Sequence, residues 1–346
     1  MAIGLLAMSC GGSSSNSPSP ATSVTPSVSV TSSPWLTPLP SVAASLSVAA
    51  TPAFVDLNSA PGVLKIDAPD SPDFAILADG YLFTTDVNGG METYDADGNA
   101  QPRPPLTGAC AAPDAGFGAV WTATCDSSSG LIRVDTASFG AANVDIGGQI
   151  PTSESSIGVG EGGVWMIRAS PQLKMDLIEV SPQVQERKVI FSESAPAGAT
   201  AVRVGFGSVW VSSPSKDTIT RIDPTSGAIL ATIKVGRQPQ FFACGEGAVW
   251  TLDQVGRSVS RIDPATNEVT ATIDLGEVVD GGDIAVGGGY VWARSSKTLL
   301  FQIDAGSNQI ITRFGPSSGS GSVAADDNYA WITAHDVNTI WRVPLD

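Results

Sequence analysis

A thirty-residue segment of the chain recurs forty residues later with the same order of apolar runs and polar turns. The segment "GSVWVSSPSKDTITRIDPTSGAILATIKVG" occupies residues 207–236, and "GAVWTLDQVGRSVSRIDPATNEVTATIDLG" occupies residues 247–276. Similar aromatic markers lie 39 to 45 residues apart along the chain, at Tyr81, Trp121, Trp165, Trp210, Trp250, Trp292 and Trp331. A period of about 42 residues is typical of one four-stranded blade of a β-propeller.

The fourth repeat shows how the strands of one blade are arranged. Residues 201–211, "AVRVGFGSVWV", read as two strands around a glycine turn, and "TITRID" (218–223) alternates as a third. After the turn "PTSG", the run "AILATIKV" (228–235) is the fourth strand. All four segments are short, rich in β-branched residues and separated by turn chemistry. The pattern excludes a doubly wound α/β fold and predicts an all-β chain.

The two ends of the repeat region predict a closed ring of seven blades. The chain stops at "TIWRV" (339–343), a third strand, followed by "PLD", so the last blade lacks its outer strand. The segment "VLKID" (63–67) matches an outer strand but has no blade before it. We therefore expect residues 62–68 to pair with 339–343, which would remove the free sheet edges. The fold class is a seven-bladed β-propeller over residues 54–346.

The first part of the chain has a different composition. Residues 1–10, "MAIGLLAMSC", form a short apolar run that ends at Cys10, and residues 11–53 are rich in Ser, Thr and Pro. No Asp, Glu, Lys or Arg occurs before Asp56. Residues 11–53 hold too little apolar surface to offset their ordering entropy, which predicts a disordered tether.

The apolar run, Cys10 and the following Gly/Ser linker resemble the N-terminus of a bacterial lipoprotein. The resemblance implies lipidation of Cys10 and attachment to the cell membrane or envelope. Ala7 stands where that motif usually has Leu, and no basic residue precedes the apolar run. A natural start upstream of Met1 would account for the missing basic residues. The alternative is an ordinary secretory signal peptide, which would make the protein secreted or periplasmic. Both interpretations predict export.

The charge and composition of the chain limit the classes of partner that it can bind. The chain carries 34 acidic and 18 basic residues, for a net charge of −16. Long-range repulsion therefore disfavours nucleic acid, and it limits membrane contact to the lipid anchor. One histidine and four scattered cysteines form no zinc-type cluster. We expect a monomer with no metal and no cofactor.

The segment "VWVSSPSKDTITRIDPTSGAILATIKVGRQP" resembles the YVTN-type seven-bladed propeller repeat. The likeness extends to the streptogramin lyases (virginiamycin B lyase-like propellers), which share a "V-W…I-x-R-I" rhythm. The first family implies an exported propeller that binds a partner. The lyase branch implies a magnesium-assisted elimination that uses histidine and glutamate near the mouth of the ring. His335 is the only histidine, so a mechanism with more than one cannot be carried over.

The cysteines suggest a second structural feature. Cys110 and Cys125 are equidistant from the centre of the hairpin turn in "DAGFGAV", and residues so placed face one another across paired strands. A Cys110–Cys125 disulfide would suit an oxidising compartment and contribute roughly 3 kcal/mol. Cys244 would remain as a buried free thiol, with no histidine in its repeat to activate it.

Loops between second and third strands share one face of a propeller with the connections between blades. Here these loops hold ligand-binding candidates that could meet an anionic group if they converge. They are Lys216, Arg257, Arg294, Lys297 and His335. The alternative is a set of separate solvated charges. His335 is also a weak catalytic candidate, because we expect neighbouring Asp336 to point to the opposite side in extended backbone.

Other conspicuous residues have structural explanations. The tryptophans are expected to pack between blades. Asp135, Asp223, Asp263 and Asp304 follow third strands, where a carboxylate can initiate a turn. "DADGN" (95–99) is half of a calcium loop but lacks the closing glutamate, so we interpret it as a turn.

We therefore favour a non-enzymatic binding or scaffolding module that uses its loop-rich face. The ligand would be a protein, a peptide, or an anionic small molecule or glycan. The alternative is a lyase-like or hydrolytic enzyme at the channel mouth, and a purely structural envelope protein is a third possibility. His335 clustered with two or more acidic side chains in a closed pocket would favour the enzyme.

Overall fold

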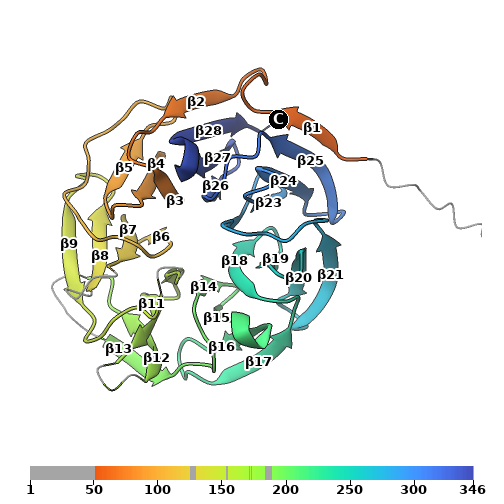
Figure 1. Cartoon of the computed structure of the whole chain (residues 1–346). Coiled ribbons are helices and arrows are strands. Elements are labelled where there is room, and N and C mark those ends of the chain that lie inside the picture. Colours follow the sequence, from red (N-terminus) through yellow and green to blue (C-terminus); the bar gives the residue numbers. More distant parts are fainter. Residues whose placement is uncertain are drawn as a thin grey trace, which may run out of the picture. The chain divides into compact units, whose positions relative to one another are not determined.

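The computed structural model describes residues 51–124, 130–152, 155–170, 172, 174–183 and 189–345. From Ala53 onward, seven β-sheets stand around a central channel, as Figure 1 shows. The seven-bladed β-propeller that the repeat predicts is thereby confirmed. We number the blades 1 to 7 in the order in which their innermost strands occur.

The first four blades contain fifteen of the described strands. They are β3 (Pro72–Ala78), β4 (Tyr81–Asp86) and β5 (Met91–Tyr94) in blade 1; β6 (Asp114–Gly116), β7 (Ala119–Ala123), β8 (Gly130–Asp135) and β9 (Ala141–Asp145) in blade 2; β10 (Gly158–Gly160), β11 (Gly163–Ala169), β12 (Met175–Val180) and β13 (Val189–Ser194) in blade 3; and β14 (Val202–Gly205), β15 (Ser208–Ser213), β16 (Thr218–Ile222) and β17 (Ile229–Lys234) in blade 4.

The remaining blades include strands from both ends of the chain. They are β18 (Pro239–Gly245), β19 (Ala248–Asp253), β20 (Ser258–Asp263) and β21 (Glu268–Asp274) in blade 5; β22 (Ile284–Gly287), β23 (Tyr290–Arg294), β24 (Leu300–Asp304), β25 (Gln309–Gly315) and β1 (Ala53–Asp56) in blade 6; and β26 (Val323–Ala325), β27 (Tyr329–Ala334), β28 (Thr339–Pro344) and β2 (Leu64–Asp67) in blade 7. Two 3-10 turns, η1 (Pro214–Lys216) and η2 (His335–Val337), follow β15 and β27.

The ring closes as the sequence predicts. Strand β2 pairs antiparallel with β28, with Leu64 opposite Arg342 and Asp67 opposite Thr339. Strand β1 was not expected: it lies parallel to β25 and makes blade 6 five-stranded. The segment before the first blade therefore contributes an outer strand to two neighbouring sheets.

Blade 1 has three strands. An isolated bridge joins Tyr94 to Ala100, after which the chain continues past Pro102, Pro104 and Pro105 without forming a strand. Proline has no backbone N–H to donate to a ladder, so this stretch cannot complete the sheet as a regular outer strand.

The tryptophans pack between blades, as predicted. All seven described tryptophans are 2% exposed or less. The indole Nε1 donates to a glycine carbonyl five residues earlier in Trp121, Trp165, Trp210, Trp250 and Trp292. Six of the seven apolar clusters join residues of two adjacent blades, and the seventh, over blades 5 and 6, also includes Phe74 of blade 1 and Ala112.

The marker of the first repeat was assigned wrongly. Tyr81 begins β4 opposite Ala78 at the hairpin turn and is half-buried, whereas Phe83 faces Ile76 and is fully buried. The same register places Trp250 opposite Ala243, so Phe83 is the counterpart of the tryptophans. Tyr81 was chosen because it is also aromatic and lies on the same strand as Phe83, two positions earlier.

Arginines from the third strands stack on the tryptophans and reach into the next blade. The Arg221 guanidinium lies 5.1 Å from the Trp210 ring centroid, and its Nη1 donates to Pro264 O and Asn267 Oδ1. Arg261 repeats this arrangement over Trp250 with Asn308 of blade 6. The blades are therefore held together by both apolar packing and charge-assisted hydrogen bonds.

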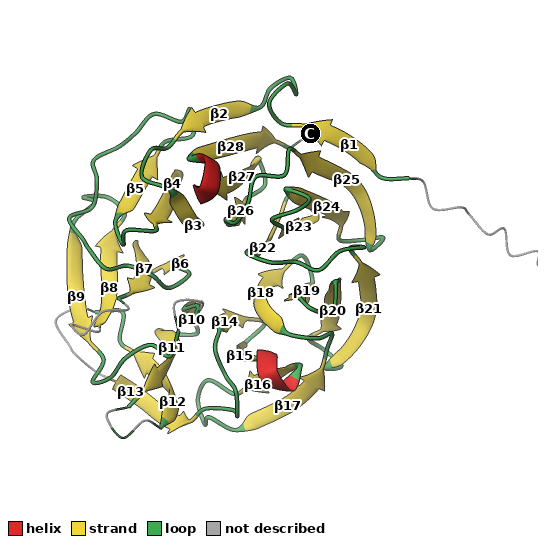
Figure 2. Ribbon diagram, in the orientation of Figure 1, coloured by secondary structure: helices red, strands yellow, loops and turns green. Residues whose placement is uncertain are grey.

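Figure 2 shows the strands of each blade and the loops that connect them, viewed along the channel. The two faces of the ring carry different turns. Because the strands in each blade are antiparallel, second-to-third-strand loops and blade-to-blade connections share one face, here called the loop-rich face. The turns after first and third strands share the other, the hairpin face. The aspartates after third strands accept hydrogen bonds from backbone N–H groups two or three residues on, which confirms their turn role: Asp135, Asp223, Asp263 and Asp304. Asp95 in "DADGN" does the same.

Several predictions concern residues outside the described ranges. Cys10, the apolar segment 1–10 and most of the tether 11–53 lie there, and β1 begins at Ala53. Cys125 also lies there, so the Cys110–Cys125 disulfide stays a prediction; the Cys110 N–H donates to Ala123 O, next to the predicted partner region. In the described part of the chain, no helix has the length and apolarity to cross a membrane.

Candidate ligand-binding site

The basic residues proposed from the loops occupy different environments on the loop-rich face. Lys216 ends η1 and is exposed, and Lys297 is exposed on the loop after β23. Arg257 is exposed, and its Nη2 lies 3.8 Å from Asp274 Oδ1. Among the described residues, no hydrogen bond or ion pair joins any two of the predicted rim residues. A joint anion site formed by these residues stays a prediction, because cations that share an anion contact the anion and not one another.

Arg294 is not part of an exposed rim. It is 0% exposed, and its guanidinium donates to the carbonyls of Thr333, Gly319 and Ser295. Burial lowers the pKa of Arg294 to about 10. The buried cation joins the end of blade 6 to the connection and second strand of blade 7, which is a structural role.

His335 and Asp336 are closer than the sequence predicts. Both belong to the 3-10 turn η2, so their side chains do not alternate as in a strand, and His335 Nδ1 lies 3.6 Å from Asp336 Oδ1. Asp336 Oδ2 also accepts from the Ser320 N–H. The expectation that Asp336 points away from His335 was wrong because it assumed extended backbone.

The surroundings of His335 do not fit the magnesium site that the lyase resemblance implies. Within the described ranges, no group of three or more His, Cys, Asp or Glu side chains is arranged to hold a metal ion. Asp73 lies on β3 of the adjacent blade, where its carbonyl accepts from Thr333 Oγ1, and burial raises the pKa of its carboxyl. No metal-assisted step is therefore derived for this chain.

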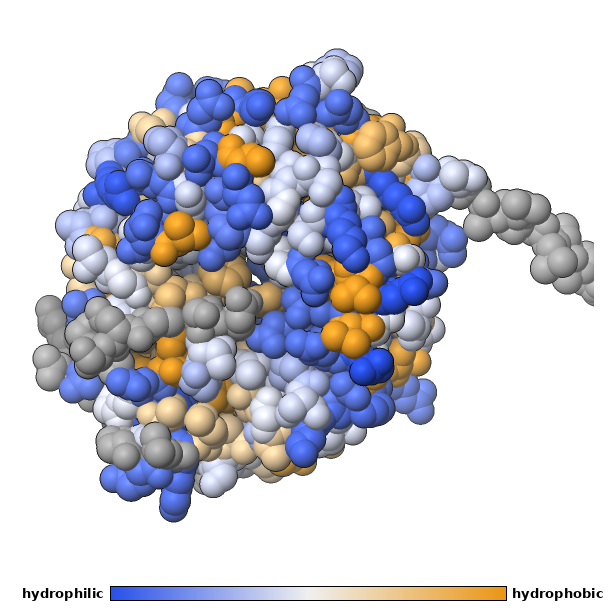
Figure 3. All heavy atoms as spheres, in the orientation of Figure 1, coloured by the Kyte–Doolittle hydropathy of each residue, from blue (hydrophilic) through white to orange (hydrophobic). Residues whose placement is uncertain are grey.

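A groove on the loop-rich face lies over blades 3 to 5. Figure 3 shows this face, on which hydrophilic and hydrophobic side chains are mixed around the opening of the channel. The groove has a volume of about 700 Å³. Its apolar lining is formed by Pro151, Met175, Ala199, Pro214 and Val255, and its polar lining by Thr200, Ser215, Asp217, Arg237 and Gln238. Such a volume and mixed lining are typical of a ligand site.

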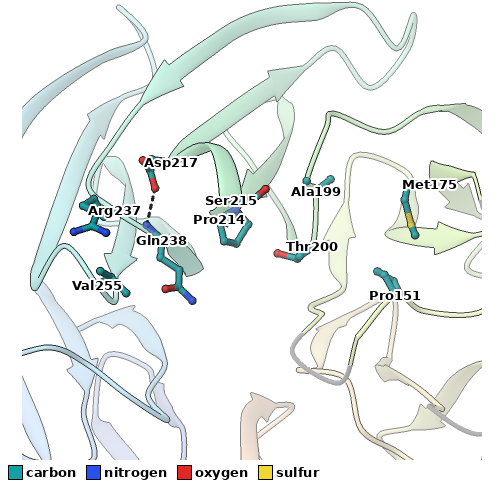
Figure 4. A pocket seen from close by; sticks show the side chains of 11 residues that line it. Pro151, Met175, Ala199, Thr200, Pro214, Ser215, Asp217, Arg237, Gln238 and Val255 are labelled. Atoms are coloured by element: carbon teal, nitrogen blue, oxygen red, sulfur yellow. Dashed lines mark hydrogen bonds between the residues drawn. The ribbon is translucent and has the colours of Figure 1, made fainter.

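One wall of the groove is fixed by Asp217. Its Oδ1 accepts from the Gln238 N–H at 3.0 Å, and its Oδ2 pairs with Lys234 Nζ at 3.1 Å. The Gln238 and Lys234 contacts hold the pKa of Asp217 below its ordinary value, so the carboxylate stays ionised. Gln238 has a positive φ of 57°, and this anchored backbone directs its amide into the open space of the groove (Figure 4).

Arg237 supplies the cationic group of the groove. Its side chain is exposed, and no described acidic residue forms an ion pair with it. Across the groove, Met175 is 41% exposed beside Pro151 (Figure 4). The arrangement places an apolar patch opposite a guanidinium and an amide, which together can hold an extended segment that carries a carboxylate.

Arg237, Gln238 and Met175 were not among the predicted site residues. The predicted residues came only from second-to-third-strand loops, although blade-to-blade connections lie on the same face. The signal was present in "GRQP" (236–239), where polar residues follow an outer strand directly. That these residues meet Met175 depends on the spatial order of three blades, which their positions in the sequence do not reveal.

The central channel contains a second group of charged residues. Arg203 Nη1 donates to the carbonyls of Ile157 and Val202, and Asp114 and Asp283 line the same cavity of about 230 Å³. Desolvation raises the pKa of both carboxyls. Cys244 is a free thiol in the channel wall, and burial raises its pKa to about 12. The thiol is therefore protonated at neutral pH and is a poor nucleophile.

The structure defines the class of the chain as a seven-bladed β-propeller with a groove on its loop-rich face. Its fold is similar to that of solved streptogramin B and virginiamycin B lyase structures. The chain is similar to virginiamycin B lyase from Staphylococcus aureus in selenomethionine form, with 17% identity, a TM-score of 0.64, and coverage of 82% of this chain and 99% of that one.

Two further solved structures have related folds. A streptogramin B lyase structure is 15% identical, with a TM-score of 0.63 over 82% of this chain and 97% of that chain. BamB from Moraxella catarrhalis is 13% identical, with a TM-score of 0.53 over 79% and 82%. No family model matches the sequence, and no curated protein matches it. At identities this low, the structural likeness establishes a shared fold and nothing more.

Proposed function

We propose that this protein is an exported, lipid-anchored binding module that holds a partner segment in the groove over blades 3 to 5. The observation that carries the proposal is the groove itself, in which exposed Met175 faces Arg237 and Gln238. Export and anchoring rest on the apolar segment that ends at Cys10, and they remain part of the proposal.

The composition of the groove favours a peptide segment over a small anion. Met175, Pro151 and Pro214 provide apolar contact area that a small anion would leave uncovered. Arg237 can pair with an acidic side chain or a terminal carboxylate, and the Gln238 amide can bond to a peptide backbone. An anionic glycan would use Arg237 but not Met175, so the two ligands depend on different residues.

Selection of displayed random peptides on the full chain tests this function. Affinities of the selected peptides would be measured by calorimetry for wild type, Met175→Ala and Arg237→Ala. We expect each substitution to weaken binding by about tenfold, as for moderate interface residues. Lys297→Ala is the matched control, since Lys297 is exposed on the same face outside the groove.

Three outcomes would contradict the proposal. Selection could yield no peptide, binding could be insensitive to both groove substitutions, or Lys297→Ala could weaken it equally. An acidic oligosaccharide that binds with dependence on Arg237 alone would replace the peptide with a glycan ligand. For the anchor, mass spectrometry should find acylated Cys10 at the mature N-terminus, and an unmodified different residue would refute it.

A further inference from the structure

The hairpin face, opposite the groove, carries two exposed phenylalanines at equivalent turns. Phe117 joins β6 to β7 and is 47% exposed, and Phe206 joins β14 to β15 and is 40% exposed. The glycine after each phenylalanine has no atom within 4 Å of where a Cβ would lie, so the space around both turns is open. These rings contribute little to the described core.

The turns that carry them occupy neighbouring positions around the channel. In five consecutive blades the same turn position holds a non-glycine residue with a φ of 47° to 56°, in the order Asp79, Phe117, Glu161, Phe206 and Glu246. The inner strands of adjacent blades are in close contact, since a Cβ on Gly116 would lie 2.7 Å from Val159 and one on Gly205 would lie 2.7 Å from Cys244. Phenyl rings and carboxylates therefore alternate along one arc.

The packing of these phenylalanines does not explain their presence. Left-handed backbone is unfavourable for a bulky aromatic residue and suits glycine, the residue found at the equivalent position 288 of blade 6. A half-exposed ring also gains little from burial within the chain. The rings would gain that burial if a partner covered them.

The carboxylates on the arc identify the charge of that partner. None of Asp79, Glu161 and Glu246 forms an ion pair with a described lysine or arginine. Their turns contain no basic residue, and the whole chain has a net charge of −16. One cation also reaches this face, because Arg221 Nη2 donates to Phe206 O. The three carboxylates and the net charge still favour a cationic segment over an acidic one.

A cavity at one end of the arc has the same combination of chemistry. It encloses about 360 Å³ between blades 7 and 1, where Asp79 and Asp326 lie beside Leu77, Tyr329 and Trp331. The chain's own Arg342 guanidinium lies 4.3 Å from the Tyr329 ring centroid. An incoming lysine or arginine would therefore pair with the two carboxylates and would not stack on that ring.

We propose that the hairpin face docks a basic, amphipathic segment of a partner protein. Its apolar side chains cover Phe117 and Phe206, and its lysines or arginines pair with the carboxylates between them. Arginine can also stack on the exposed phenyl rings. This interaction uses the face opposite the groove, so it is independent of the function proposed for the loop-rich face.

The probe is a short fluorescent peptide in which lysine alternates with leucine, measured by fluorescence anisotropy with the full chain. Two controls are a peptide of equal charge in which serine replaces leucine, and one in which glutamate replaces lysine. We expect the Lys/Leu peptide to bind best, with an affinity that falls as salt rises. No binding, or equal binding of the Lys/Ser peptide, would overturn the proposal.

The Phe117→Gly/Phe206→Gly variant separates docking from folding. Glycine accepts the positive φ, so the melting temperature should stay constant or rise, while peptide affinity falls by about tenfold or more. Glu161→Gln/Glu246→Gln should weaken binding and flatten its salt dependence. Glu268→Gln, an exposed charge on outer strand β21, is the control. Unchanged affinity in the phenylalanine variant, or a lower melting temperature, would refute the docking role.

Discussion

Blades 4 and 5 are joined to their neighbours differently from blade 1. In blade 5, Trp250 donates to Gly245 O while Arg261 stacks over its ring and bonds to blade 6. Blade 1 has Phe83 at the tryptophan position and Thr93 opposite it, so neither contact can form. Blade 1 thus lacks the interactions that the repeat supplies elsewhere.

Arg103 compensates for the missing outer strand of blade 1. It comes from the proline-rich segment where the outer strand would be, and it pairs with Asp86 at 2.9 Å, Glu92 at 2.9 Å and Asp70 at 3.2 Å. Asp86 is buried, whereas the Arg103 side chain is half-exposed. One blade edge is therefore held by ion pairs where others have a backbone ladder, which makes the stability of this edge depend on ionic strength.

The largest expected effect lies in blade 5. Trp250→Ala should lower the free energy of unfolding by about 3–5 kcal/mol, because it removes a buried ring and leaves a cavity. Trp250→Phe imitates blade 1 and should cost about 1–3 kcal/mol through the unpaired Gly245 carbonyl. Denaturant unfolding measures both. If both variants lost the same free energy of unfolding, the volume of the ring would be unimportant, and the contrast drawn between blade 5 and blade 1 would fail.

A smaller effect is expected at the edge of blade 1. Arg103→Gln should lower the free energy of unfolding by about 1–3 kcal/mol, because it leaves the buried Asp86 carboxylate without its cation. Salt screens such pairs, so the difference from wild type should shrink at high ionic strength. Lys234→Gln, which removes an exposed pair with Asp217, is the control and should cost about 0–1 kcal/mol. A salt-independent loss at Arg103 would contradict the compensation.

The smallest effect concerns turns that both kinds of blade share. Hydrogen bonds from Ser226 lower the pKa of Asp223 in blade 4, and those from Asn99 lower the pKa of Asp95 in blade 1. A lowered pKa contributes stability above the ordinary value of Asp, and this contribution disappears as the pH falls through the folded-state value. Asp223→Ala and Asp95→Ala should therefore slightly lower the melting temperature at neutral pH. Thermal unfolding at acidic pH should show no difference, and a gap that persists there would exclude this cause.

The sequence predicted what the repeat controls. Blade number, ring closure at residues 64–67 and the packing of the tryptophans all follow from periodicity. The position of Arg294 could also have been predicted, because it lies two residues after Trp292 on the same strand and therefore faces the same packed layer. The error came from ending the strand one residue early.

Other features depend on local geometry or on the spatial order of blades. The contact between His335 and Asp336 requires a 3-10 turn, which their residue types do not indicate. The groove combines Met175 with Gln238 from separate blades, and its wall depends on a positive φ fixed by Asp217. Strand β1 pairs in parallel with a segment more than two hundred residues away, for which the repeat contains no template.

Strand β1 gives the ring a mechanical safeguard. Any tension that enters through the N-terminal residues reaches β1 first, and only afterwards β2, the strand that closes the propeller. Peeling β1 from β25 would leave that blade with four strands, the same number as its regular neighbours. A pull on the chain would thus have to break the β1–β25 pairing before it reached the strand that closes the propeller.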